Sequence, residues 1–277
     1  MTECGLTNLA TCLPEKFFEY LSGMLTAPVQ PLLNLARDLL SQPVNLTLFQ
    51  PLWSLIVYLI SVFYGLFFLF AGFNLMISGY DSAKRDQAKS WLRNIVLMVL
   101  LVQSSYLMYG LLLELSNLLT AGIINFIDPN FFLMKTDNFT NFSLQLVLLI
   151  PQLFFILMTV LLLGLRYLMV ALGIVLFPLA IFCYFIPPLH SYGKLILSSL
   201  VTVIFITFFD ALFLLGASLL LSQPPFDSFK IVLTTVSFLS LDLIMIGTLL
   251  FVLIKAASSV LETSLGKEFK GVFQHLF

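Results

Sequence analysis

Residues 52–78 read LWSLIVYLISVFYGLFFLFAGFNLMIS, and no charged residue interrupts them. An α-helix needs about 20 apolar residues to cross the roughly 30 Å hydrocarbon layer of a bilayer. The uncharged region around this stretch extends from Leu39 to Tyr80, which is more than enough for one crossing. This part of the chain therefore predicts a membrane-spanning helix.

The composition of the whole chain agrees with this prediction. Of its 277 residues, 60% are hydrophobic and 10% are charged. That is more apolar surface than one globular core can hide from water, so we expect an integral membrane protein surrounded by the lipid bilayer. The net charge of −1 provides no general basic field for nucleic acid, so any contact with DNA should be local and transient.

Further apolar runs predict the remaining crossings, and two amphipathic segments precede the first one. Residues 13–26 and 29–41 each place apolar side chains on one helical face, which is typical of short helices lying in the membrane interface. We therefore expect an all-α polytopic fold with about five transmembrane helices, with six as the alternative. The later runs cover residues 94–119, 144–187, 195–221 and 231–254.

Three regions follow from this pattern. Residues 1–50 should form an N-terminal segment with the amphipathic helices, and residues 51–256 the transmembrane domain. Residues 257–277 should form an amphipathic, basic tail.

Residues 144–187 leave the number of crossings open. They contain a single charge, Arg166. Two helices would form a hairpin with Arg166 at its turn, whereas one long helix would carry Arg166 at depth in the membrane. Pro151 and Pro178 predict kinks or breaks because proline removes a backbone hydrogen bond, and Pro187 predicts a helix stop.

The charges near residues 79–95, GYDSAKRDQAKSWLRNI, predict the orientation. Basic residues in short loops are retained on the cytoplasmic side, and this loop carries Lys84, Arg85, Lys89 and Arg93. The C-terminal tail is also basic, so both should lie in the cytoplasm, with the N-terminus outside. An odd number of crossings satisfies this condition, which favours five crossings of the plasma membrane.

Spacing gives the basic loop a second expected property. Arg85, Lys89 and Arg93 are four residues apart, which places them on one face of a helix. Such a face is suited to contact with anionic lipid headgroups or with a partner protein.

Several features fall on the predicted outer side. Three glycosylation sequons begin at Asn45, Asn138 and Asn141. Cys4 and Cys12 are close enough in sequence to form a disulfide if this end of the chain faces an oxidising space.

The sequence contains few groups suited to catalysis. It has no phosphate-binding loop, no H-E-x-x-H motif, no G-x-S-x-G turn, and no cysteine pair with metal-ligand spacing. We therefore expect no enzymatic activity, no catalytic residue, no metal and no cofactor.

Polar groups inside apolar runs are costly in a membrane and therefore suggest a function. Arg166 could pair with Asp210 or Asp242 as a structural ion pair, or these residues could line a polar conduit; both interpretations stay open here. Gln103 forms a polar patch with Ser104 and Ser105, for which interhelical hydrogen bonding is the commoner use.

Two stretches carry a family resemblance: ISGYDSAKRDQAKSWLRNIV (77–96) and RYLMVALGIVLFPLAIFCYFIPP (166–188). Their order in the chain resembles the TrbL-type polytopic inner-membrane subunits of conjugation and type IV secretion systems. Similar subunits occur in archaeal DNA-import machines. The residues that match the pattern are Lys84, Lys89, Arg93, Arg166, Pro178 and Pro187.

The resemblance implies a homo-oligomeric membrane component beneath a pilus or translocation channel. It implies partner ATPases and pilus or channel subunits, and amphipathic N-terminal helices on the outer side. The function expected on this basis is a non-catalytic channel or scaffold that helps to move DNA or protein across the membrane. The alternative is a small-solute transporter or channel.

Overall fold

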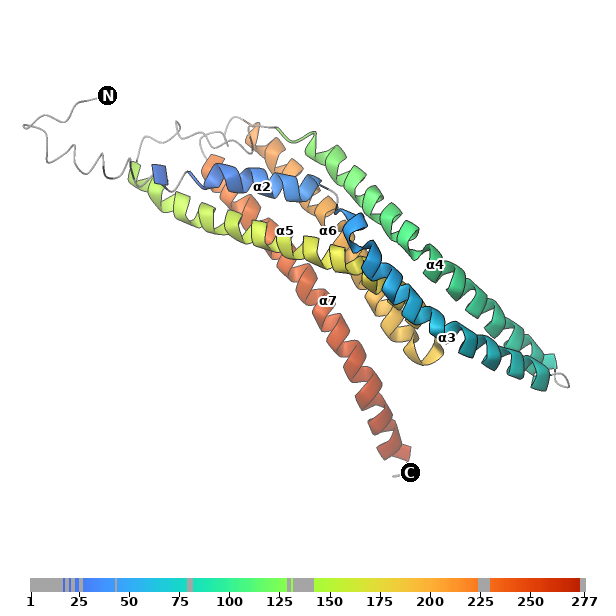
Figure 1. The fold of residues 1–277 in the computed structure, drawn as a ribbon. Coiled ribbons are helices and arrows are strands. Elements are labelled where there is room, and N and C mark those ends of the chain that lie inside the picture. The colour runs from blue at the N-terminus through green and yellow to red at the C-terminus, as the bar shows by residue number, and fades with distance from the viewer. Residues whose placement is uncertain are drawn as a thin grey trace, which may run out of the picture. The chain divides into compact units, whose positions relative to one another are not determined.

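The structure is a computed structural model, and it is helical in all the regular elements that it describes (Figure 1). The described residues are 17, 20, 23–24, 27–42, 44–78, 82–128, 131, 142–223 and 230–274. The elements are α2 (Val29–Ser41), η1 (Leu46–Phe49), α3 (Gln50–Ile77), α4 (Ser82–Ile124), α5 (Phe142–Phe185), η4 (Pro187–Leu189), α6 (His190–Leu221) and α7 (Lys230–Gln274).

Five of the described helical segments are long and apolar enough to cross a membrane. Many of their large apolar side chains are exposed, as for Leu66, Leu107 and Phe251. Such side chains are stable in contact with lipid chains, where exposure carries no hydrophobic cost. The chain is thus an all-α polytopic membrane protein, as predicted. The candidate spans are Leu46–Ile77, Ser82–Ile124, Leu149–Phe185, His190–Leu221 and Ile231–Lys255.

Helix α5 settles how residues 144–187 are built. It is one helix of 44 residues, so the hairpin with Arg166 at its turn was wrong. Of the predicted kinks or breaks at Pro151 and Pro178, the breaks are absent, because α5 continues through both residues; the kinks stay a prediction. A proline inside a helix removes one hydrogen bond, and this loss does not by itself end the helix. The third predicted break is present: α5 ends at Phe185, and Pro187 begins η4.

The turn after α5 is closed by local contacts. His190 Nδ1 lies 2.6 Å from the carbonyl oxygen of Tyr184, and the two rings are in contact at a tilt of 43°, with centroids 4.4 Å apart. A Cβ at Gly193 would overlap the backbone of Tyr184 and Ala180. The close approach of α6 to the end of α5 therefore requires glycine at this position.

At the N-terminal side, α2 is the second amphipathic helix predicted from the sequence. Its buried residues are Val29, Leu33, Ala36 and Leu40, which share one helical face. Of the segment 13–26, only residues 17, 20, 23 and 24 are described.

The predicted outer-side features are only partly described. Cys4, Cys12, Asn138 and Asn141 lie outside the described residues. Asn45 is exposed and precedes η1, where its side-chain oxygen accepts a hydrogen bond from the Thr47 backbone N–H at 3.1 Å.

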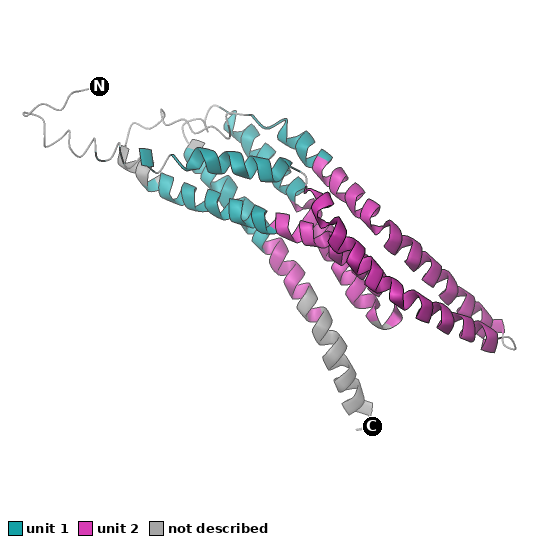
Figure 2. Ribbon diagram, in the orientation of Figure 1, with its two compact units in different colours: residues 1–42, 118–165, 207–246 teal, residues 43–117, 166–206, 247–277 magenta. Residues whose placement is uncertain are grey.

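The chain divides into two compact units, coloured in Figure 2. Unit 1 comprises residues 1–42, 118–165 and 207–246, and unit 2 comprises residues 43–117, 166–206 and 247–277. Helices α4, α5, α6 and α7 contribute residues to both units.

The core of unit 2 is formed by apolar side chains of α3, α4, α5 and α6. Val102, Ile174 and Ile204 are fully buried in it. Gly173 on α5 lets Tyr109 on α4 approach the helix closely: a Cβ at this position would overlap the Tyr109 hydroxyl and lie 2.9 Å from Leu200 Cδ2. The α4–α5 contact in unit 2 therefore depends on a residue without a side chain.

Unit 1 has its own apolar contacts along α5 and α7. Ile156 and Leu163 of α5, and Leu241 and Met245 of α7, are fully buried. The ring of Phe238 lies 6.4 Å from that of Phe131, measured between centroids.

We expect Gly173→Ala to lower the free energy of unfolding by about 1–3 kcal/mol, because overfilling a packed site forces its neighbours apart. Gly164→Ala is the matched control on the same helix, since nothing lies within 4 Å of its added Cβ. The control should be neutral or slightly stabilising, because alanine favours a helix over glycine. Unfolding of the purified protein in mixed micelles measures both; equal stability of the two variants would contradict the packing described for Gly173.

Candidate functional site

Arg166 is the only charged residue of α5, and it is 7% exposed. Its Nε donates to the carbonyl oxygen of Val203 at 3.3 Å, and its Nη2 donates to that of Ile204 at 3.0 Å. Both acceptors belong to α6. A buried guanidinium is costly unless its donors are satisfied, and carbonyl oxygens provide this satisfaction inside unit 2.

A row of buried polar side chains on α4, which we call the polar seam, joins α4 to three other helices. It consists of Ser105, Tyr109 and Ser116. The three residues are at most 1% exposed. Their spacing of four and seven places them on one face of the helix.

Each residue of the polar seam takes part in an interhelical hydrogen bond within unit 2. The indole N–H of Trp53 on α3 donates to Ser105 Oγ at 2.9 Å. The Tyr109 hydroxyl donates to the Val170 carbonyl of α5 at 2.6 Å. Ser116 Oγ donates to the Ile204 carbonyl of α6 at 2.8 Å, the same oxygen that Arg166 contacts.

Only part of this seam was predicted from the sequence. Of the predicted patch, Ser105 bonds between helices, whereas Ser104 bonds to Leu101 in its own helix. Gln103 is exposed. Tyr109 and Ser116 were missed, although their spacing of four and eleven residues from Ser105 was a signal that could have revealed them.

A second pair of polar contacts joins α5 and α7 in unit 1. Thr159 Oγ1 donates to Asp242 Oδ1 at 2.7 Å, and Gln152 Nε2 donates to Thr234 Oγ1 at 3.4 Å. Asp242 is 3% exposed. Its Oδ2 and the Gln152 Oε1 accept no hydrogen bond from the described residues. Asp210, the other predicted acid, is fully buried on the α6 part of unit 1.

The basic residues predicted as a cytoplasmic loop lie on the first turns of α4. The helix begins at Ser82, and the four cations are exposed. Their side chains therefore remain accessible to solvent, lipid headgroups or a partner. The residues are Lys84, Arg85, Lys89 and Arg93.

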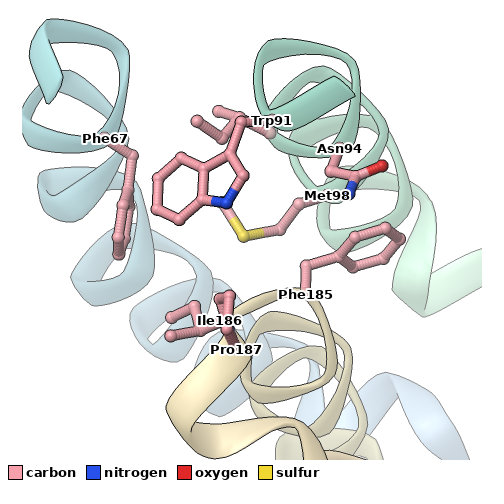
Figure 3. A pocket seen from close by; sticks show the side chains of 8 residues that line it. Phe67, Trp91, Asn94, Met98, Phe185, Ile186 and Pro187 are labelled. Carbon is pink, nitrogen blue, oxygen red and sulfur yellow. The ribbon is translucent and has the colours of Figure 1, made fainter. Parts of the chain in front are cut away.

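Two cavities lie on either side of Trp91, at the level where the charged part of α4 becomes apolar. The first is small and mostly apolar, about 50 Å³, and Figure 3 shows Trp91 and Met98 of α4 facing Phe67 of α3, with Phe185, the last residue of α5, also in the lining. The second is a hollow of about 300 Å³ between the end of α3 and the start of α4. Trp91 contributes to the wall of both.

Comparison of the chain with family models, with curated proteins and with solved structures gives no match. Within the described part of the chain, no three His, Cys, Asp or Glu side chains are grouped closely enough to hold a metal ion. The chemistry visible in the described residues is hydrogen bonding between helices and exposure of positive charge.

We expect Ser116→Ala to lower the free energy of unfolding by about 1 kcal/mol, because hydrogen bonds between membrane helices contribute about 0.6 and up to about 1.7 kcal/mol. Ser104→Ala is the matched control, since it removes the same hydroxyl from the same helix but breaks only a bond within that helix. Unfolding in mixed micelles compares the two. A larger loss for Ser104→Ala than for Ser116→Ala would refute the interhelical role of the seam.

Proposed function

We propose that this protein is a non-catalytic membrane component of a type IV secretion or conjugation-like apparatus, which helps to move DNA or protein with energy from partner ATPases. The proposal rests on one observation, namely that α4 combines two features in a single continuous helix. Its first turns expose four cations, and the same unbroken helix carries the polar seam.

The length of α4 supports this role. A helix of 43 residues is about 65 Å long, whereas the hydrocarbon layer is about 30 Å thick. The charged residues 82–94 make up about 20 Å of this length, and they lie beside the last turns of α3. A partner bound to these residues would act directly on the helix that the seam joins to α3, α5 and α6.

The residues that carry the family resemblance also support the proposal. Lys84, Lys89 and Arg93 are exposed, as a docking surface requires, and Arg166 is buried and hydrogen bonded. On this basis we propose a homo-oligomeric component with pilus or channel subunits and ATPases as partners.

The charge distribution supports an orientation in the plasma membrane. With five crossings, the basic start of α4 and the C-terminal tail lie in the cytoplasm, and the N-terminus lies outside. The end of α5, with His190 and Lys194 after it, then also lies on the cytoplasmic side.

A second candidate, a small-solute or ion channel, is favoured by one observation in unit 1. Asp242 Oδ2 and Gln152 Oε1 are buried without a hydrogen bond from the described residues, and such oxygens could be met by a permeating ion or water. Solute flux into proteoliposomes that contain this protein alone would favour the channel over the secretion component.

We expect deletion of the gene to abolish DNA or protein transfer while growth and membrane integrity stay normal. The double variant Arg85→Glu and Lys89→Glu should reduce transfer strongly, because an acidic partner would be repelled where it was attracted. Transfer efficiency between cells, with membrane insertion checked by fractionation, measures both.

Lys194→Glu is the control for Lys89→Glu alone, since each reverses one exposed charge and Lys194 lies outside the basic start of α4. It should leave transfer near the normal level. Normal transfer in the deletion strain would overturn the proposed function. Normal transfer in the double variant would show that Arg85 and Lys89 do not bind a partner and serve only to set the orientation in the membrane.

A further inference from the structure

The hollow of about 300 Å³ beside Trp91 has the size of a small-ligand site. Its walls come from the last turn of α3 and the first turns of α4, both in unit 2. Three polar side chains line it with an ammonium or amide group: Asn74, Lys84 and Gln87.

The lining is chemically suited to an anion. Lys84 provides a positive charge, and the amides of Asn74 and Gln87 provide N–H donors. No acidic side chain of the described residues lines the hollow. Between residues 81 and 94 there are four cations and two acids, Asp81 and Asp86, so the local field still attracts negative charge.

Apart from Ser78, whose hydroxyl donates to the Leu75 carbonyl of its own helix, the other part of the wall is apolar, which argues for a lipid over a soluble anion. Ile77, Ala88 and Trp91 line the hollow together with the polar groups. Trp91 also lines the apolar cavity next to it, where Phe67 and Met98 lie (Figure 3). Charged and amide groups beside apolar side chains in one lining match a phospholipid, whose phosphate is attached to an apolar body.

The position along the helices agrees with this ligand. Ile77 ends α3, and the charged part of α4 gives way to an uncharged run after Arg93. Tryptophan is enriched at the level of lipid headgroups, and Trp91 lies at this transition. A lipid phosphate at the membrane surface is therefore within reach of the hollow, whereas a nucleic acid would have to enter the headgroup layer.

We propose that this hollow binds the phosphate-bearing headgroup of an anionic phospholipid, with Lys84 as its main charged contact and Asn74 and Gln87 as further donors. This is a defined site, in contrast to the diffuse attraction of lipid by all basic residues of α4. It does not depend on the proposed role in DNA or protein transfer.

The test uses the full-length protein in detergent micelles, titrated with dioleoyl phosphatidylglycerol or with zwitterionic dioleoyl phosphatidylcholine. Native mass spectrometry counts the lipid molecules retained on the protein. We expect one phosphatidylglycerol to be retained at least about tenfold more tightly than phosphatidylcholine, because the choline ammonium of phosphatidylcholine offsets the charge of its phosphate and is repelled by the nearby basic residues. Equal retention of the two lipids would overturn the proposal.

Two neutralising variants separate a defined site from diffuse attraction. Diffuse attraction weakens binding by about fivefold for each charge removed, whichever charge it is. We expect Lys84→Gln to lower phosphatidylglycerol affinity by at least about tenfold more than Lys89→Gln does. Equal losses in the two variants would overturn the site.

A third variant leaves the charge unchanged. Asn74→Leu should lower phosphatidylglycerol affinity by about three- to tenfold through the lost donor, whereas diffuse attraction predicts no loss. Asn74 and Lys84 are exposed, so these variants should fold, and an unchanged elution volume in size-exclusion chromatography checks this. Wild-type affinity in Asn74→Leu would count against the site.

Competition identifies the source of the phosphate. Inorganic phosphate, or a single-stranded oligonucleotide, is added to the complex of protein and phosphatidylglycerol. Retention of the lipid supports the proposal. Displacement by inorganic phosphate would show a soluble-anion site, and displacement by the oligonucleotide that requires Lys84 would show a nucleic-acid site; either result would replace the lipid assignment.

Discussion

The carbonyl oxygen of Ile204 accepts hydrogen bonds from both Arg166 and Ser116. Unit 2 depends on such bonds from a side chain of one helix to a backbone carbonyl of another. Lipid chains offer no partner to a buried donor, so each polar group in a membrane helix must be satisfied within the protein. Here the partners are largely backbone carbonyls of neighbouring helices. The register of α4 and α5 against α6 is thereby set by a few polar side chains, while apolar packing fills the space between them.

The sequence predicted the helices better than the contacts between them. Run lengths indicated the crossings, because an apolar run must match the bilayer, but Pro151 and Pro178 suggested breaks that α5 does not have. The exposed face with Arg85, Lys89 and Arg93 followed from spacing. The partners of Tyr109 and Ser116 could not be predicted, because they are backbone carbonyls on other helices, and every residue type offers the same carbonyl.

Helix α4 carries both the exposed positive charge and the hydrogen bonds between helices that characterise this protein. Its first turns expose positive charge and line the hollow beside Trp91, and its later turns carry the polar seam. Because the helix is continuous, a ligand bound at its start and the contacts made by its seam belong to one rigid element. In the account proposed here, this element joins a partner or lipid at the cytoplasmic surface to the helices that lie in the membrane.

The orientation of five crossings is the central claim, and labelling of single cysteines tests it most directly. In a background without Cys4, Cys12 and Cys183, a single cysteine replaces Lys89, Lys270 or Thr7 in three separate variants. Intact cells are then treated with a membrane-impermeant maleimide. The account predicts that positions 89 and 270 react only after the membrane is permeabilised, whereas a cysteine at Thr7 reacts in intact cells. Labelling of position 270 from outside would contradict it, because the two basic ends would then lie on opposite sides.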